Sequence, residues 1–359
     1  MNVVELERAR VIKQANGLLD LAPTTITSVA SSRSPGGAHD YYSEGDYWWQ
    51  NPDDPNGPYI RRDGYTNPDA FFGHRRLVMA LSVQVAALAS AYKITRDEKY
   101  AAHAIAHLRA WFIAPETRMN PHLEFAQAIQ GICTGRGVGI IDTTQLIEVA
   151  LAIEVLRDVL GEDLSVVRGW FADYLRWVTT HPYGIDESAM RNNHATAWVL
   201  QVAAFAYLVG DENTLADCRR RYKEILLPNQ MADDGSFQHE LRRTKPYGYS
   251  VFNLELMTAL CQLLSTTQDD VWRFTTSDGR TIRRGMEFLY PYLQDKETWP
   301  YARDVMRWEG WPSQPSSLLF TGVALDEPRF VELWRALSRQ VGDEEITRNT
   351  PIRQPVLWF

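Results

Sequence analysis

The chain has 359 residues, of which 45% are hydrophobic, enough for one large folded domain or two ordinary ones. Its formal net charge of −8 argues against a nucleic-acid partner, because proteins that neutralise phosphates usually carry a basic surface. Three cysteines with no CxxC pair argue against a disulfide scaffold and suit a reducing compartment.

The N-terminal segment is charged and amphipathic. The spacing of its apolar residues predicts a helix over 3–20, and the segment lacks the pattern of a secretory signal peptide. No apolar run approaches the ~18 residues of a membrane span. We therefore expect a cytoplasmic protein without a membrane partner; the oligomeric state is left open.

Residues 23–70 read as one long loop. They are rich in Pro, Gly, Asp, Tyr and Trp and have no helical period. Because loops of this length are usually functional, we expect a lid over a cleft. Arg61, Arg62 and Tyr65 combine positive charge with aromatic surface, which suits an anionic sugar chain. The alternative is a rigid lid that only packs on the domain.

From residue 71 the pattern is helical almost to the end. A helix over 74–94 is followed by a second that ends near 113, and the hairpin layout recurs around 160, 210 and 270. The sequence therefore predicts an all-α fold: a single domain over 1–359 that forms an α/α toroid, an incomplete barrel of six to seven helical hairpins. Long rim loops at 23–70, 115–141, 228–250 and 295–316 favour the toroid over an open solenoid.

A glycine-rich stretch lies within residues 118–143. Its four glycines resemble a phosphate-binding loop, but neither Lys-Ser/Thr nor a βαβ unit accompanies them. We interpret them as positions where the backbone closely approaches another segment or a ligand. Arg136, which stands among them, is a candidate to bind substrate.

The segment "NNHATAW" begins an otherwise apolar helix with Asn192, Asn193 and His194. Trp198 lies one turn after His194, on the same side of the helix, and is a candidate to contact a ligand. Asparagines also cap helices, so a purely structural role is the alternative. Two adjacent asparagines and a histidine exceed what a cap requires.

A second cluster is "ELRRTKPYGYS", residues 240–250. Arg243, Tyr247 and Tyr249 stand on a segment shaped by Pro246 and Gly248, and their side chains can face one ligand. A solvated basic loop with packed tyrosines is the alternative. Arg303, in the tryptophan-rich segment 299–312, is a further candidate for an anionic substrate.

These segments resemble the alginate-lyase superfamily of polysaccharide lyases. The resemblance rests on "NNHATAW" followed by "ELRRTKPYGYS", with "GRGVGIIDT", "RMNPHLEFAQAI", "YIRRDGYTNPD" and the closing "RQPVLW". It covers about residues 40–359. It is closest to the branch numbered family 38, which is associated with glucuronan and polymannuronate. Ser250 stands where the older alginate-lyase branch has a histidine.

The resemblance implies an α/α toroid and metal-independent β-elimination of an anionic polysaccharide, with no cofactor. It implies catalytic roles for Asn193, His194, Arg243 and Tyr249. The sequence also lacks the ligand spacings of common metal sites. An α/α-toroid glycoside hydrolase, which requires two facing carboxylates, and a non-catalytic uronate-binding protein are the alternatives.

Overall fold

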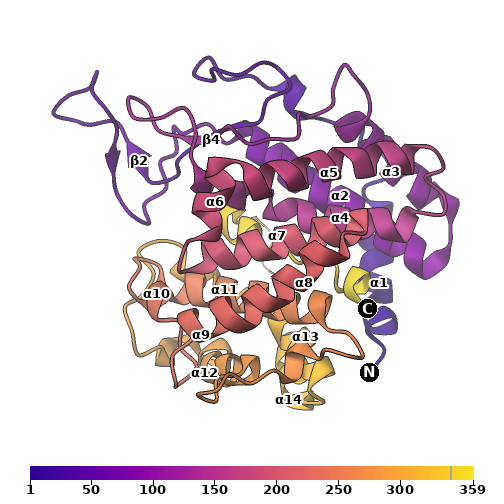
Figure 1. Ribbon diagram of the computed structural model, residues 1–359, viewed down its shortest axis with the longest axis vertical. Coiled ribbons are helices and arrows are strands. Elements are labelled where there is room, and N and C mark those ends of the chain that lie inside the picture. The colour runs from indigo at the N-terminus through magenta and orange to yellow at the C-terminus, as the bar shows by residue number, and fades with distance from the viewer. Residues whose placement is uncertain (340–341) are drawn as a thin grey trace.

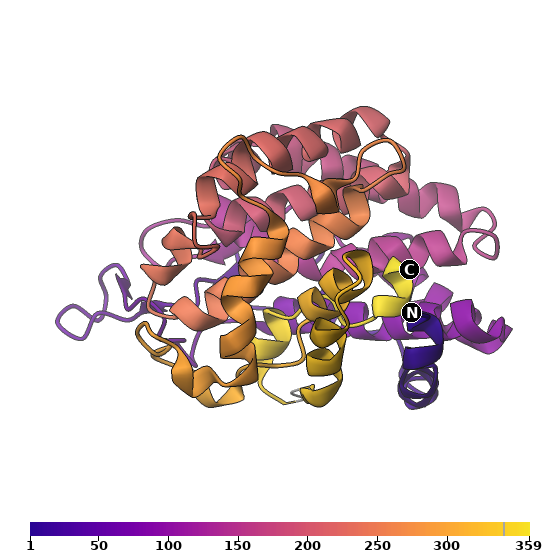
Figure 2. The same ribbon diagram turned by 90° about the horizontal axis from the view of Figure 1, so that it is seen from below.

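The computed structural model describes residues 1–339 and 342–359 and is built mainly of helices in two layers (Figures 1 and 2). Helices alternate along the chain between these layers. The inner helices are α2 (Gly73–Thr95), α4 (Leu146–Leu156), α7 (Asn193–Val209), α11 (Pro246–Leu264) and α13 (Ser316–Ala324). The outer helices are α1 (Val3–Asn16), α3 (Glu98–Phe112), α5 (Asp163–Thr180), α8 (Glu212–Arg221), α12 (Ile282–Gln294) and α14 (Pro328–Ala336).

The two layers differ in how apolar residues are spaced. Helices α7 and α11 are apolar on nearly every side and almost completely buried, as expected for helices enclosed by others. The outer helix α12 buries Ile282, Met286, Leu289 and Leu293, which recur at helical spacing and form one stripe toward the core. The residue patterns of these three helices therefore agree with the layers in which they lie.

The inner helices pack against one another in chain order, from α2 through α4, α7 and α11 to α13. The C-terminal turn η7 (Pro355–Trp358) packs on α1, α2 and α4 and brings the two termini close together (Figures 1 and 2). Buried Glu148 of α4 fixes this contact by accepting hydrogen bonds from Gln354 N and Trp358 Nε1. The predicted all-α fold, an α/α toroid, is confirmed.

The segment 23–70 contains short strands that the sequence did not indicate. Strand β1 (Tyr42–Glu44) pairs in parallel with β4 (Phe125–Ala128), and β2 (Trp48–Trp49) pairs antiparallel with β3 (Ile60–Arg61). Because each has only two to four residues, no alternation could reveal them. Tyr41 to Asp46 are buried, so this part is built into the domain, while the β2–β3 hairpin projects from it (Figure 1).

The glycine-rich stretch brings two segments into contact, as expected from its small residues. A Cβ on Gly135 would lie 1.8 Å from the carbonyl oxygen of Glu124. The stretch continues into the 3₁₀ helix η2 (Gly137–Gln145), which packs on β4 and the inner helices. The remaining short elements are η1 (Ile26–Ser28), α6 (Pro182–Ser188), the π-helix η3 (Tyr222–Leu226), α9 (Leu227–Gln230), α10 (Gln238–Leu241), η4 (Val271–Arg273), η5 (Lys296–Thr298), η6 (Trp308–Gly310) and α15 (Glu344–Arg348).

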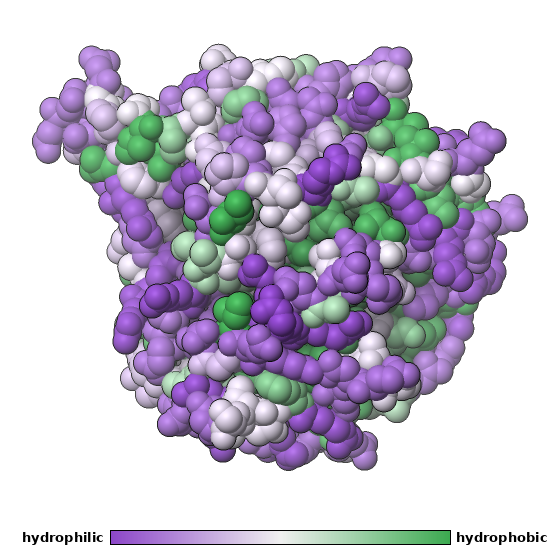
Figure 3. Space-filling model, in the orientation of Figure 1, coloured by the Kyte–Doolittle hydropathy of each residue, from purple (hydrophilic) through white to green (hydrophobic). Residues whose placement is uncertain are grey.

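Helix α2 is the one described helix that is long and apolar enough to cross a membrane, by length and composition. This differs from the expectation that no such run exists. Of its most apolar window 67% is buried, because α1, α3 and α4 pack around it. The inner layer of the toroid therefore accounts for its apolar character. On the face shown in Figure 3, hydrophilic side chains dominate and apolar ones form separate patches.

Glu255 is a buried carboxylate on α11 that does not line the cavity described below. It accepts hydrogen bonds from Ser316 Oγ at 2.7 Å and Ser317 N at 3.1 Å. Burial raises its pKa to about 7 even though these hydrogen bonds act in the opposite direction. In the unfolded chain the pKa of a glutamate carboxyl group is about 4.3. The unfolded state thus loses this proton first, and the folded state loses stability as pH rises between those values.

We expect Glu255→Gln, which cannot ionise, to remove this contribution. Relative to the wild type, the variant should gain thermal stability as pH is raised from about 5 to about 8. The measurement is the Tm of both proteins across this range. A Tm difference that stays constant with pH would contradict the assignment.

Candidate active site

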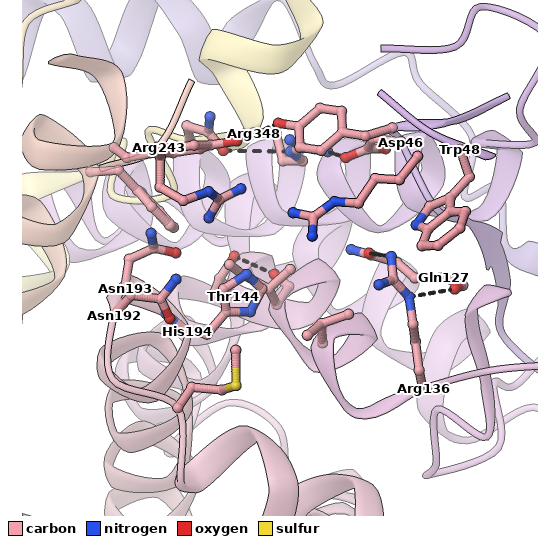
Figure 4. A pocket seen from close by; sticks show the side chains of 18 residues that line it. Asp46, Trp48, Gln127, Arg136, Thr144, Asn192, Asn193, His194, Arg243 and Arg348 are labelled. Atoms are coloured by element: carbon pink, nitrogen blue, oxygen red, sulfur yellow. Dashed lines mark hydrogen bonds and ion pairs between the residues drawn. The ribbon is translucent and has the colours of Figure 1, made fainter. Parts of the chain in front are cut away.

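A cavity of about 210 Å³ opens at the end of the toroid where the rim loops meet (Figure 4). Side chains reach it from the N-terminal segment, from η2, from the first turns of α7 and α11, and from the end of α15. The lining residues are Asp46, Tyr47, Trp48, Arg61, Gln127, Arg136, Val138, Ile141, Thr144, Met190, Asn192, Asn193, His194, Arg243, Tyr249, Phe252, Arg348 and Asn349.

A buried network of ion pairs lies against the cavity. Arg75 of α2 contacts Asp46 at 2.5 Å and Asp142 of η2 at 3.1 Å, and Arg348 of α15 also pairs with Asp46. Although burial opposes ionisation, the two arginines hold the pKa of Asp46 well below its usual range. Asp46 therefore stays charged, and the network joins four distant parts of the chain.

Tyr249 lies in the first turn of α11 and lines the cavity. Its hydroxyl lies 2.5 Å from the hydroxyl of Tyr47, and the guanidinium carbon of Arg243 lies 4.6 Å from its ring centroid. Burial raises the pKa of the Tyr249 hydroxyl above its ordinary value, while Arg243 and the hydrogen bond from Tyr47 lower it. The net direction is upward, because the effect of burial exceeds that of the neighbouring cation and the hydrogen bond.

Asn193 is held from behind by a buried carboxylate. Its backbone N–H donates to Glu240 Oε1 at 2.6 Å and its side-chain Nδ2 donates to Glu240 Oε2 at 2.7 Å. One N–H of the side-chain amide remains for a ligand. Burial raises the pKa of Glu240 to about 7, against the effect of the two hydrogen bonds from Asn193. The neighbouring Asn192 caps α7, since its side chain accepts from His194 N.

His194 has a similar partner. Its Nδ1 lies 2.6 Å from Oε1 of Glu187, and the histidine side chain is 17% exposed while that of Glu187 is 1% exposed. The exposed part of the ring contributes to the cavity wall. Figure 4 shows Asn193 and His194 across the open space from Arg243 and Arg348.

Four arginines line the cavity, and they differ in how their charge is balanced. Arg61 and Arg243 share Asp63, at 2.5 Å and 3.2 Å, and Arg348 pairs with Asp46. Arg136 donates only to Gln127, to its backbone oxygen and to Oε1, both at 3.0 Å. Among the described residues no carboxylate forms a salt bridge with Arg136. Its charge is therefore available to an anionic ligand.

The cavity brings together most of the residues singled out from the sequence. The lining includes Tyr249, His194, Asn193, Asn192, Arg243, Arg61 and Arg136. Three exposed candidates lie outside it. Arg62 stacks on Trp49 at 5.1 Å, Tyr65 is 47% exposed, and Arg303 pairs with Glu297 at 2.5 Å and stacks on Trp308.

Two further candidates are corrected by the structure, because they are core residues. Tyr247 is fully buried and donates its hydroxyl to Tyr292 O at 2.9 Å. Trp198 is 5% exposed and its indole N–H donates to Val178 O at 3.0 Å. Tyr247 stands two residues before Tyr249 on a helix, so the two side chains point about 160° apart about the helix axis. Neither Tyr247 nor Trp198 faces the cavity.

Sequence analysis missed several residues of the site. Tyr47 and Arg348 line the cavity, and Glu187 supports it from behind. The aromatic run at 47–49 was visible but carried no sign of which ring turns inward. Arg348 and Glu187 lie in helices of five and seven residues, too short for a helical period to show which side is buried. Only the packing of the folded chain identifies them.

The chain matches the model of one protein family, described as alginate lyase, over residues 25–299. A search of curated proteins finds no match. Among solved structures, an alginate lyase from Bacteroides ovatus is similar with a TM-score of 0.81 and 29% identity, covering 98% of this chain and 92% of that one.

A second similar structure shares the fold at lower identity. Alginate lyase A1-III from Sphingomonas species A1 has a TM-score of 0.58 and 16% identity, and the match covers 97% of this chain and 94% of that one. A histidine-to-alanine variant of A1-III, complexed with a tetrasaccharide, gives a TM-score of 0.61 at the same identity and coverage. Because the family model covers well over half of the chain, the protein belongs to the alginate lyase family and is a polysaccharide lyase that acts on uronate polymers.

Proposed function

We propose that the protein cleaves β-1,4-linked mannuronate or glucuronate by metal-independent syn β-elimination and leaves a 4,5-unsaturated uronate end. The observation that carries the proposal is that Tyr249, Arg243, Asn193 and His194 line one cavity. The phenol, the amide, the imidazole and the guanidinium are the groups that this elimination requires.

The reaction begins with a proton that is hard to remove. The C5 hydrogen is α to a carboxylate, and its loss places a second negative charge on an anion. Hydrogen-bond donors aimed at the carboxylate stabilise this charge, as in an oxyanion hole, where one donor contributes about 3 kcal/mol. We assign this role to the free amide N–H of Asn193, with Arg243 and His194 adding positive charge.

Tyr249 then transfers the protons. As phenolate it takes the C5 hydrogen, the C5–H electrons form the C4–C5 double bond, and the C4–O4 bond breaks. The departing O4 receives the proton from the phenol, which regenerates the phenolate. In mannuronate and glucuronate units H5 and O4 lie on one face of the ring, so one group is sufficient. Guluronate places H5 on the opposite face, and there His194 is the candidate base.

The substrate is an anionic chain, and the arginines support its binding. Arg61 and Arg136 extend the positive lining beyond the reacting group, so that further carboxylates of an oligosaccharide can bind, and Asn192 is a further lining residue proposed to bind substrate. The sequence resemblance to family 38 favours glucuronan and polymannuronate as polymers. We propose both as substrates.

The structure gives no support to the hydrolase alternative. A glycoside hydrolase needs two carboxyl groups about 5–10 Å apart that face the bond. Asp46 is the one carboxylate among the described lining residues, and two arginines hold it. Asp142 and Glu240 are buried, are not among the lining residues, and accept hydrogen bonds from Tyr41 and Asn193.

The first prediction tests the reaction itself. The wild-type protein, incubated with glucuronan, polymannuronate or polyguluronate, should produce the ultraviolet absorbance of an unsaturated uronate with at least one of the first two. Tyr249→Phe should reduce kcat by at least about 10³-fold, because the proton-transfer group is lost. Reducing ends without absorbance would indicate a hydrolase, and neither signal would indicate a binding protein.

The second prediction concerns Tyr47. Removing its hydroxyl by Tyr47→Phe takes away a hydrogen bond that lowers the pKa of Tyr249. The phenolate then forms at higher pH, so activity near neutral pH should fall by about tenfold and recover as pH rises. The measurement is kcat/KM of both proteins between about pH 6 and 10. An unshifted profile would show that the contact has no influence on the base.

The third prediction concerns Arg136. Arg136→Gln keeps hydrogen bonding but removes a charge that no carboxylate balances. We expect KM for polymeric substrate to rise about tenfold, which corresponds to about 1.4 kcal/mol, with little change in kcat. Added salt should raise the wild-type KM more than that of the variant. Arg303→Gln, outside the cavity, is the matched control and should keep the wild-type KM.

A further inference from the structure

We propose that Glu187 is a positioning residue for His194: it keeps a proton on Nδ1 and thereby presents Nε2 to the substrate. The inference deepens the proposed function and rests on it for its catalytic consequence. Which nitrogen of His194 carries the proton can be measured without any substrate.

The contact between the two residues is short and buried. Glu187 Oε1 lies 2.6 Å from His194 Nδ1, and the glutamate side chain is 1% exposed. Its second oxygen, Oε2, is buried and has no hydrogen-bond partner among the described residues. Among the described residues, His194 is thus the one whose side chain hydrogen-bonds to the Glu187 carboxylate.

The unpaired oxygen of Glu187 makes this arrangement costly in free energy. A buried carboxylate is normally satisfied at both oxygens, and an unpaired polar atom costs free energy. Glu255 and Glu240 follow that rule, since both oxygens of each accept hydrogen bonds. Glu187 departs from it, as does Glu148 of α4, and the one hydrogen bond of Glu187 goes to a residue of the cavity wall.

The element that carries Glu187 is held firmly. Helix α6 begins with Pro182 at its first turn, and His181 caps it through Nδ1. A Cβ on Gly184 would lie 1.8 Å from the carbonyl oxygen of Val178, so α6 packs in direct backbone contact with the end of α5. A rigid support of this kind fixes a ring orientation better than a loop does.

The charge of the partner decides the tautomer. An ionised carboxylate only accepts hydrogen bonds, so the imidazole nitrogen that faces it must carry a proton. In the neutral ring Nε2 then holds the lone pair, and in the charged ring Nε2 carries a second N–H. In both states Nε2 is the atom that meets the substrate, as a proton acceptor or as a donor to its carboxylate.

The test compares the wild type with Glu187→Gln. A glutamine amide can accept from Nδ1–H or donate to a bare Nδ1, so it no longer selects one tautomer. Long-range ¹H–¹⁵N spectra of the substrate-free protein, at a pH where the ring is neutral, report which nitrogen is protonated. His194→Gln identifies the signals by their loss. We expect the Nδ1–H form in the wild type and a mixture of tautomers in Glu187→Gln.

Kinetics supply the second measurement. We expect Glu187→Gln to lower kcat by about 10- to 100-fold while KM changes less than about threefold, the range typical for a partner that orients a functional histidine. Glu187→Asp, which keeps the charge, should restore part of the activity. Glu255→Gln is the matched control for loss of a buried carboxylate and should leave kcat unchanged.

The outcomes separate this inference from the proposed function. An Nε2–H tautomer in the wild type, or a Glu187→Gln protein with the wild-type tautomer and kcat, would overturn the role of Glu187. A wild type that cleaves no uronan would overturn the proposed function, while the spectra would still decide the tautomer. Tm values well above the assay temperature for Glu187→Gln and Glu187→Asp would exclude unfolding as the cause of lost activity.

Discussion

The site depends on a buried ion-pair network that no single segment could form. Asp46 from the N-terminal segment, Arg75 from α2, Asp142 from η2 and Arg348 from α15 meet next to the cavity. Each charge is expensive to bury alone, and removing one partner of such a network typically costs about 3–5 kcal/mol. The segments must therefore assemble together. This fixes Tyr47 and Trp48, the neighbours of Asp46, on the cavity wall.

The inner helices deliver the remaining groups through their first turns. Asn193 and His194 open α7, and Tyr249 lies in the first turn of α11, so the adjacent packing of these two helices sets their separation. Buried carboxylates on the short helices α6 and α10 then orient the two α7 side chains. The packing of α7 on α11 thus sets the separation of the reacting groups, and the short helices α6 and α10 set the orientation of Asn193 and His194.

Burial has opposing consequences for this chemistry. It strengthens each hydrogen bond and ion pair in the cavity, because the local dielectric is low. It also raises the pKa of the phenol that has to lose a proton, and Arg243 together with Tyr47 opposes that rise. A bound uronate would remove more water from the same space. The balance between desolvation and local charge therefore controls how readily the base forms.

The sequence by itself determined the helical architecture and the reacting groups. Apolar spacing indicated repeated helical hairpins, and the motifs around Asn193 and Tyr249 led to residues that share one cavity. These features are local, because helical period and motif spacing extend over a few turns of chain.

Only the tertiary structure decided which side chains surround these groups. Tyr47 meets Tyr249 across 202 residues of sequence and Arg348 meets Asp46 across 302, distances over which no periodicity carries information. The same limit explains why Tyr247 and Trp198, two positions from Tyr249 and four from His194, proved to be core residues. Which side of a helix faces a cavity depends on what packs against the other sides, and that is settled when the helices assemble.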